Sequence, residues 1–242
     1  MVDKNKSDIS ILGIIPARGG SKRLPKKNIK KLIDKPLIAW TIERTNSSKL
    51  LTKTIINTDD KEIAEVAQKY GGNVPFLRPK ELATDEASSY DVIFHTIDFF
   101  EKKGEYFDYI ALFEPTSPLR KDDDIDKALS LLIEKSDEAD SLISLGEVHL
   151  ENPLWMKKIS NNFVQNYLNK EEMPARSQEL ERAYFPYGVI YASKISTLRK
   201  YRTFYQPKTI PYLVERWQNY EIDDYYDFVC IEAILKERGK KK

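Results

Sequence analysis

Short apolar runs alternate with amphipathic segments along most of this chain, and this alternation constrains the fold more than any other feature. Short apolar runs predict strands that are buried on both faces. Segments with apolar residues three and four positions apart predict helices that cover such a sheet. The predicted strands are 9–15, 53–57, 74–77, 107–113, 139–145 and 188–192, and the predicted helices begin at Pro36 and cover 60–70, 88–103, 122–135 and 223–236. We therefore predict an α/β fold, with helices on both faces of a mostly parallel sheet.

The alternation stops between residues 147 and 185, where Trp155, Phe163 and Tyr167 lie among asparagine and lysine. We interpret this segment as an extension within one domain that covers residues 1–242. Aromatic side chains on such an arm need another surface to bury them.

Charge and hydropathy exclude several classes of partner. Lys and Arg number 39 against 38 Asp and Glu, a formal net charge of +1. Proteins that cover nucleic acid usually carry a clear basic excess, so we expect no nucleic-acid partner. No apolar stretch approaches the ~20 residues that span a bilayer, and residues 1–8 lack the apolar core of a secretory signal. We therefore expect a soluble, cytoplasmic protein without a membrane partner.

The cysteine and histidine content also limits the chemistry. The single cysteine, Cys230, cannot form an internal disulfide, which suits a reducing compartment, and its apolar neighbours predict a buried core position. His95 and His149 have no partner at the spacing of a zinc site. A metal would be held by oxygen atoms, which indicates magnesium or manganese.

A glycine- and lysine-rich loop directly follows the first predicted strand. Ligands of open α/β sheets bind at the carboxyl ends of strands, and tightly folded glycine backbone can aim amide groups at an anion. The loop lacks both GxxxxGK and GxGxxG, so it is neither of the two familiar phosphate-binding loops. Arginine and lysine in it would pair with phosphate oxygens, and we predict a triphosphate site; the alternative is a solvated basic loop. The loop reads Pro16-Ala-Arg-Gly-Gly-Ser-Lys-Arg-Leu-Pro-Lys-Lys-Asn28.

This loop and four later segments resemble the motifs of the acylneuraminate cytidylyltransferase family, the CMP-sialic acid synthetases. They occur in the family's order over nearly the whole chain. The resemblance implies a Rossmann-like nucleotidyltransferase fold with a dimerisation arm at 147–185. The four segments are Leu77-Arg-Pro-Lys-Glu-Leu-Ala-Thr-Asp-Glu-Ala-Ser-Ser89, Glu114-Pro-Thr-Ser-Pro-Leu-Arg120, Phe185-Pro-Tyr-Gly-Val-Ile-Tyr191 and Glu221-Ile-Asp223.

The resemblance also implies roles for individual residues at the nucleotide. Arg78 and Ser88 match positions of the cytidine pocket. From the residues alone, Arg78 can equally be a loop cation and Ser88 the N-cap of the following helix. The first loop would bind the CTP phosphates and the nucleotide through Arg18, Gly19, Gly20, Ser21, Lys22, Lys27 and Asn28.

Two further roles concern the metal and the sugar. Glu221 and Asp223 resemble the acidic pair that holds Mg²⁺ in the family. Alternate residues of an extended segment point to the same side, so both carboxylates can face one ion. Either carboxylate can instead cap the next helix. Arg176 resembles the arginine that meets the sugar carboxylate, in an extension that packs across a homodimer.

Taken together, the resemblance implies a Mg²⁺-dependent cytidylyltransferase. The anomeric hydroxyl of an acidic nine-carbon sugar, a nonulosonic acid of the sialic, legionaminic or pseudaminic type, would attack the α-phosphorus of CTP and release pyrophosphate. Arg18, Lys22 and Asp223 would be the catalytic residues, with positioning and charge neutralisation supplying most of the catalysis.

Two positions depart from the family pattern. Glu114 stands where relatives often carry Gln, and a carboxylate 4 Å from a phosphate charge costs about 4 kcal/mol at an effective dielectric near 20. Glu114 would therefore face hydroxyls of the sugar or the ribose, pair with a metal, or be protonated. Our hypothesis is that it contacts a substituent of the sugar. Tyr187 stands where relatives commonly carry Asn, so it leaves the identity of the sugar open.

Three other functions remain open. The same fold could act on 3-deoxy-octulosonic acid or on a sugar 1-phosphate, although the arm with Arg176 favours a nonulosonic acid. A non-catalytic nucleotide-binding regulator would need Arg18 and Lys22 but no acidic pair.

Overall fold

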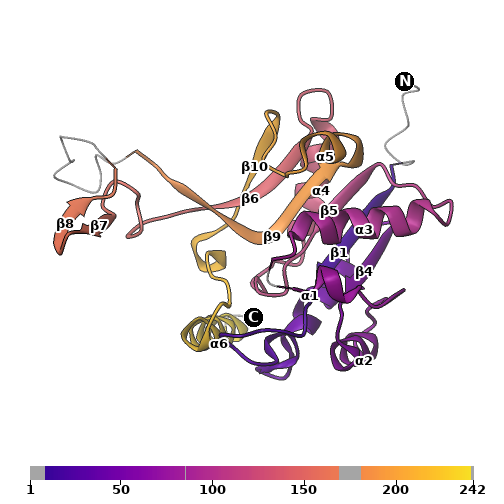
Figure 1. Ribbon diagram of the computed structural model, residues 1–242, viewed down its shortest axis with the longest axis horizontal. Coiled ribbons are helices and arrows are strands. Elements are labelled where there is room, and N and C mark those ends of the chain that lie inside the picture. The colour runs from indigo at the N-terminus through magenta and orange to yellow at the C-terminus, as the bar shows by residue number, and fades with distance from the viewer. Residues whose placement is uncertain (1–8, 85, 169–180, 241–242) are drawn as a thin grey trace.

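A mixed six-stranded sheet forms the centre of the computed structural model, which describes residues 9–84, 86–168 and 181–240. Its strand order is β10-β6-β9-β5-β1-β4 (Figure 1). The β1–β4, β1–β5 and β6–β10 pairs are parallel, whereas β9 runs antiparallel to β5 and β6. The predicted α/β fold with a mostly parallel sheet is confirmed. The strands are β1 (Ile11–Pro16), β4 (Lys53–Asn57), β5 (Tyr109–Leu112), β6 (Ser141–Glu147), β9 (Tyr184–Lys194) and β10 (Thr209–Leu213).

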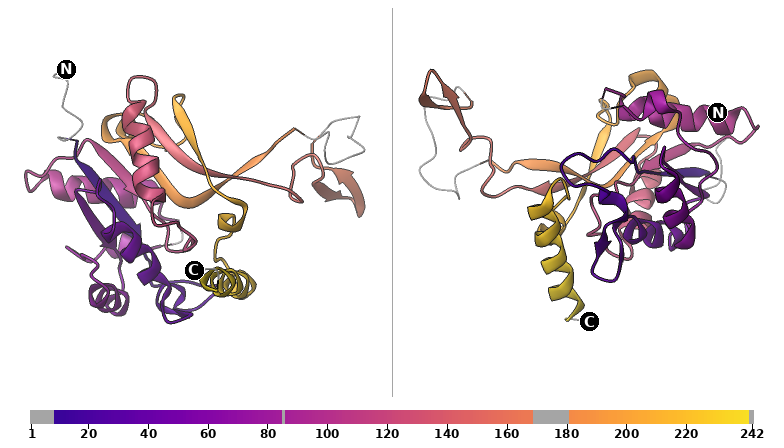
Figure 2. Two further views of the ribbon diagram at one scale, coloured as in Figure 1. Left: turned by 180° about the vertical axis from the view of Figure 1, so that it is seen from behind. Right: turned by 60° about the horizontal axis from the view of Figure 1, so that its bottom comes forward.

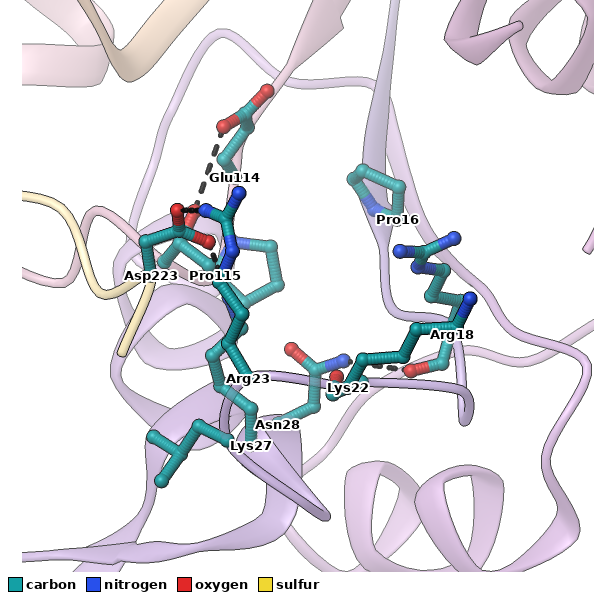
Figure 3. A pocket seen from close by; sticks show the side chains of 12 residues that line it. Pro16, Arg18, Lys22, Arg23, Lys27, Asn28, Glu114, Pro115 and Asp223 are labelled. Carbon is teal, nitrogen blue, oxygen red and sulfur yellow. Dashed lines mark hydrogen bonds and ion pairs between the residues drawn. The ribbon is translucent and has the colours of Figure 1, made fainter. Parts of the chain in front are cut away.

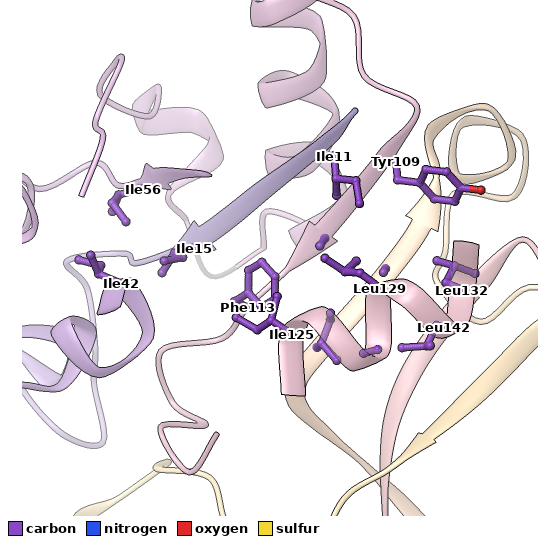
Figure 4. Packing of buried hydrophobic residues seen from close by; sticks show 14 of the residues in the cluster. Ile11, Ile15, Ile42, Ile56, Tyr109, Phe113, Ile125, Leu129, Leu132 and Leu142 are labelled. Carbon is purple, nitrogen blue, oxygen red and sulfur yellow. The ribbon is translucent and has the colours of Figure 1, made fainter. Parts of the chain in front are cut away.

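Helices cover both faces of this sheet. Residues of β1 alternate between the faces, because successive side chains of a strand point in opposite directions. Ile11 and Ile15 pack in a cluster with residues of α1, α2 and α4 (Figure 4), whereas Leu12 and Ile14 pack with residues of α3 and α5. The helices are α1 (Leu37–Asn46), α2 (Lys61–Lys69), α3 (Ser89–Glu101), α4 (Asp124–Glu134), α5 (Ile195–Tyr201) and α6 (Tyr225–Gly239), with the short 3₁₀ helices η2 (Lys27–Ile29), η3 (Lys80–Leu82) and η5 (Arg216–Gln218).

The last helix, α6, packs away from the sheet against the segment between β1 and α1. Phe228 and Ile231 lie three positions apart and join a buried cluster with Leu24 and Leu37. The predicted burial of Cys230 is wrong, because its side chain is exposed on α6. An apolar run in a helix places only part of its residues on the packed face.

The predicted strand 74–77 is also wrong. Its backbone lies beside β4, but it forms only an isolated parallel bridge between Thr58 and Leu77. Pro75 has no N–H to donate to a ladder, which weakens strand pairing in this segment. The sequence pattern did not reveal α5 or β10, which follow β9 directly.

Residues 147–168 and 181–185 leave the body of the protein as an arm (Figures 1 and 2). Its tip carries an antiparallel hairpin of β7 (Lys157–Ser160) and β8 (Phe163–Asn166). Ile159, Phe163 and Val164 are 80%, 72% and 72% exposed. A second two-stranded sheet, β2 (Lys31–Leu32) with β3 (Lys35–Pro36), precedes α1. Among the described residues, no helix is both long and apolar enough to cross a bilayer.

Candidate functional site

A cavity of about 490 Å³ opens where β1 and β5 end at their carboxyl termini (Figure 3). Its walls come from three segments that lie far apart in the sequence: residues 16–28 after β1, residues 114–116 after β5, and Asp223 before α6. The predicted nucleotide loop is thus part of a cavity of the size that binds small molecules, ~300–1,000 Å³.

Hydrogen bonds within the loop after β1, and hydrogen bonds from that loop to residues outside it, fix the shape of the loop. Asn28 is buried, and its Nδ2 donates to the carbonyl oxygen of Arg18 over 3.1 Å. The amide of Gly19 donates to Asp59 Oδ1 over 3.0 Å. A Cβ on Gly19 would lie 2.6 Å from Asp60 Oδ2, so only glycine fits there. Asn28 therefore lines the cavity and also holds the loop that would bind phosphate.

Asp60, rather than Thr58 or Asp59, is the N-cap of α2. Its carboxylate accepts hydrogen bonds from the amides of Glu62 and Ile63. This arrangement leaves Asp59 turned toward Gly19, next to the phosphate-binding loop.

Cationic side chains line both sides of the cavity. Arg18 and Lys22 line it and face Glu114 and Asp223 across it (Figure 3). Lys27 Nζ donates to the carbonyl oxygen of Ile222 over 2.8 Å and lies 3.9 Å from Asp223 Oδ1. Burial, and the neighbouring Arg18 charge, lower the pKa of Lys27. Positive charge concentrated beside glycine amides is suited to a polyphosphate.

The two residues of the predicted metal pair lie in different surroundings. Glu221 Oε1 accepts hydrogen bonds from Ser117 Oγ over 2.6 Å and from the amide of Gly188. Asp223 lines the cavity and forms an ion pair with Arg23. In the described part of the chain, no three His, Cys, Asp or Glu residues are placed so that they could together hold a metal ion. A single carboxylate beside a phosphate loop still fits Mg²⁺, which commonly binds one or two carboxylates and substrate phosphates.

Glu114 brings a carboxyl group to the opposite wall of the same cavity. Burial and the negative charge of Glu221 raise the pKa of Glu114 to about 7. Thr116 Oγ1 donates to Glu114 Oε2 over 3.4 Å. A Cβ on Gly188 would lie 2.7 Å from the Cβ and Oε2 atoms of Glu114, so glycine at this position makes room for the carboxyl group.

The comparisons with known proteins agree with this geometry. The sequence model of the family described as cytidylyltransferase matches residues 12–238. The chain belongs to the cytidylyltransferase family. It is 35% identical to the CMP-N,N'-diacetyllegionaminic acid synthase of Legionella pneumophila and 31% identical to a pseudaminic acid cytidylyltransferase of Campylobacter jejuni, over 93% of this chain and 96% of each relative. The N-acylneuraminate cytidylyltransferase of Escherichia coli is 29% identical over 96% of this chain and 54% of that protein.

Solved structures support the fold of this cytidylyltransferase. A CMP:2-keto-3-deoxy-manno-octonic acid synthetase complexed with CTP matches with a TM-score of 0.68, 17% identity, and coverage of 95% of this chain and 99% of that chain. A 4-diphosphocytidyl-2C-methyl-D-erythritol synthase from Anaerococcus prevotii matches with a TM-score of 0.63, 14% identity, and coverage of 94% and 99%.

Other predicted site residues of the cytidylyltransferase lie outside the lining of this cavity. Arg78 is buried, and its Nε and Nη2 donate to the side-chain and backbone oxygens of Asn57 over 2.6 and 2.7 Å. Ser88 is the N-cap of α3 and accepts from the amide of Tyr90 over 3.2 Å, as its alternative interpretation predicted. Their contacts with cytidine stay predictions.

Besides Glu114, two residues were predicted to contact the sugar, and the structure describes only one of them. Tyr187 lies on β9, where burial raises its pKa and its ring centroid lies 5.2 Å from that of Phe185. Arg176 lies outside the described residues.

Sequence analysis missed three residues of the cytidylyltransferase site. Arg23 lies inside the predicted phosphate-binding loop and forms an ion pair with Asp223. Its positive charge in that loop was the sequence signal that could have identified it. Asp59 follows β4 directly, at the edge of the sheet where ligands bind. Arg120 closes the motif that begins at Glu114, and its four hydrogen bonds to Thr41, Glu114, Gly188 and Val189 became visible only in the structure.

Proposed function

We propose that this cytidylyltransferase transfers CMP from CTP to the anomeric hydroxyl of a nonulosonic acid and releases pyrophosphate. The observation that carries the proposal is the cavity that Arg18, Lys22 and Lys27 line together with the carboxyl groups of Glu114 and Asp223. The cations suit a triphosphate, and the opposite wall leaves room for a second substrate. Relatives named for legionaminic, pseudaminic and acylneuraminic acids support a nonulosonic acid as that substrate.

The loop after β1 would bind the triphosphate through its amides and its cations. Gly19, Gly20 and Ser21 supply backbone N–H groups, and Arg18 and Lys22 supply side-chain donors. CTP would have to compete with Asp59 for the Gly19 amide. The anomeric hydroxyl attacks the α-phosphorus in line and loses its proton to water, and the bond from the α-phosphorus to the oxygen that bridges to the β-phosphate breaks. The cations offset the charge that develops on pyrophosphate.

Asp223 would hold Mg²⁺ together with phosphate oxygens of CTP. When bound, the ion would neutralise phosphate charge and hold the triphosphate in line for attack. Arg23 now balances the Asp223 carboxylate, so binding of CTP and the ion would release this ion pair. Glu221 Oε1 is held by Ser117 and by Gly188 within β9, and its role as a second ligand of the ion stays a prediction.

The acceptor sugar would lie between Glu114 and Tyr187. A carboxyl group with a pKa near 7 can accept a hydrogen bond and, when protonated, can also donate one. This property supports our hypothesis that Glu114 contacts a hydroxyl or amide substituent of the sugar. Unchanged kinetics of Glu114→Gln on every candidate sugar would contradict this assignment.

The assay that tests the reaction measures pyrophosphate release from CTP with Mg²⁺ and a panel of acceptors. We expect release with one nonulosonic acid, and loss of release with a chelator, with Asp223→Ala and with Lys22→Ala. Asp137→Ala and Lys61→Ala are matched controls outside the cavity and should retain activity. Release only with 3-deoxy-octulosonic acid or a sugar 1-phosphate would refute the assigned acceptor, and CTP binding without release would indicate a regulator.

The arm and the location of the protein form a separate part of the proposal. A homodimer would cover the exposed Ile159, Phe163 and Val164 of the arm and could bring Arg176 to a sugar. We expect light scattering to give a dimer mass that falls to the monomer mass in Val164→Lys. A cytoplasmic location suits the unpaired thiol of Cys230, and recovery from the periplasmic fraction would contradict it.

A further inference from the structure

A second cavity, also of about 490 Å³, is lined by a separate set of residues. We call it the back cavity; its walls are formed by α1, residues 119–123, η5 and the carboxyl end of α6. None of its lining residues belongs to the predicted nucleotide or sugar site. Trp40 and Trp217 supply indole rings, and Leu119 and Leu235 supply apolar surface. The volume lies within the range of small-molecule sites, ~300–1,000 Å³.

The aromatic part of the back cavity is arranged for stacking. Trp217 Nε1 donates to Glu215 Oε2 over 2.6 Å and Trp40 Nε1 donates to the carbonyl oxygen of Leu32 over 3.2 Å, so each ring is held in place at its polar edge. The guanidinium carbon of Arg238 lies 3.6 Å from the centroid of the Trp217 ring. A guanidinium plane stacked on one ring can receive a second planar ring on its other face.

Cations outnumber carboxylates in the lining of the back cavity. Arg44, Arg120, Lys121 and Arg238 line the cavity together with Asp122 and Asp123, and Lys121 lies 2.6 Å from Glu215. Arg44 lies 2.5 Å from Asp122, and Asp123 lies 2.6 Å from Lys127 on the next turn of α4, which neutralises both carboxylates. A guanidinium carries five N–H donors, so a single carboxylate leaves capacity for a phosphate. Indole rings combined with excess cations fit a planar base that carries phosphate.

The back cavity shares a wall with the candidate active site. Arg120 lines the back cavity, and its Nη2 donates to the carbonyl oxygens of Glu114 and Gly188 over 2.8 and 2.7 Å. Glu114 in turn lines the active-site cavity. A ligand that moves Arg120 therefore moves the residue proposed to contact the acceptor sugar. Two sites are coupled when a ligand binds one conformation of the shared wall more tightly than another conformation.

We propose that the back cavity binds a nucleoside phosphate, and that its occupant changes the affinity of the active site for the acceptor sugar through Arg120. The binding step is independent of the proposed catalytic function. The change in acceptor affinity rests on that function.

Tryptophan fluorescence reports binding directly, because two of the three tryptophans line the back cavity. The probes are CMP and AMP, with cytidine and ribose 5-phosphate as the halves that lack phosphate or base. We expect saturable quenching by CMP and AMP and at least tenfold weaker binding of both halves. Lys22→Ala, which alters the active-site loop, should leave this quenching intact.

Substitutions in the lining separate the back cavity from the active site. Arg238→Glu and Arg44→Gln should each weaken the quenching at least tenfold, whereas Lys236→Glu, outside the lining of the cavity on α6, should not. Two variants from different helices guard against a local change of fold, which circular dichroism would detect. Absence of saturable quenching, or quenching that Lys22→Ala abolishes and Arg238→Glu preserves, would overturn the binding site. If the nucleotide quenches but leaves the acceptor KM of the active enzyme unchanged, the coupling through Arg120 is refuted.

Discussion

Replacement of Arg120 by methionine should destabilise this cytidylyltransferase more than replacement of any exposed arginine. The Arg120 side chain is buried and joins three parts of the fold. Its Nε donates to the carbonyl oxygen of Val189 over 2.8 Å, Nη1 donates to Thr41 Oγ1 over 2.8 Å, and Nη2 donates to the carbonyl oxygens of Glu114 and Gly188. Methionine fills similar space but donates no hydrogen bond.

The structure sets the expected magnitude. Each buried acceptor left without a partner costs about 1–3 kcal/mol. Methionine also removes the positive charge that interacts with the carboxylates of Glu114, Asp124 and Glu221, which leaves these partly buried charges without compensation. Part of this loss of stability is offset, because burial of the guanidinium is itself unfavourable. The same burial lowers the pKa of Arg120 to about 10. We expect a net loss of about 3–5 kcal/mol from a free energy of unfolding of ~5–15 kcal/mol.

Equilibrium unfolding in urea at pH 7 measures this loss. Arg199→Met is the matched control, because Arg199 forms ion pairs with Asp98 and Glu101 at the surface. Exposed pairs of this kind contribute ~0–1 kcal/mol, so the control should remain close to the parent protein. Arg120→Lys should fall between the two, since one ammonium group reaches fewer of the four acceptors. A free energy of unfolding within 1 kcal/mol of the parent for Arg120→Met, on the order of one surface ion pair, would refute the role of Arg120 as a buried link.

Three further predictions concern the cavity. The pKa of Glu114 is raised from 4.5 to about 7 in the folded protein, so its contribution to stability is full below pH 4.5 and is lost as pH rises through 7. Glu114→Gln should therefore reduce the change in the free energy of unfolding between pH 4.5 and 8 by at most about 3 kcal/mol. Urea unfolding that gives the same pH profile for the variant and the parent would contradict the raised pKa. Gly188→Ala should lower stability by about 1–3 kcal/mol, because the new Cβ meets Glu114, while Gly20→Ala, whose Cβ meets no atom within 4 Å, should not. Equal melting temperatures of the two would argue against this contact. Asn28→Ala removes the hydrogen bond to the carbonyl oxygen of Arg18. The loss of one hydrogen bond, about 1 kcal/mol, should raise the KM for CTP about fivefold. Asn166→Ala, on β8, should leave this KM unchanged.

Local patterns in the sequence were sufficient to predict the elements that build the site. The apolar run before Pro16 predicted β1, and the glycines and cations that follow predicted an anion-binding loop at its carboxyl end. Ser88 was predicted as a possible N-cap, and it caps α3. These features depend on residues within a few positions of one another, and local backbone chemistry decides them.

Contacts between distant segments could not be predicted in the same way. Glu221 and Asp223 were expected to face one ion because alternate residues of a strand share a side. Their segment is not a strand in the structure, and Glu221 is drawn to Ser117 and Gly188, residues 104 and 33 positions away. The packing of the turn after β5 against β9 decides this orientation.

The sequence alone determined the fold class, the loop after β1 and the family motifs, because each is encoded in a short run of residues. Only the tertiary structure decided that β9 runs antiparallel between β5 and β6, that Cys230 is exposed, and that Arg120 joins the active site to a second cavity. The physical reason is the same in each case. Which segments pair, and which face of a helix is buried, depends on how surfaces from remote parts of the chain fit together, and no local pattern contains that information.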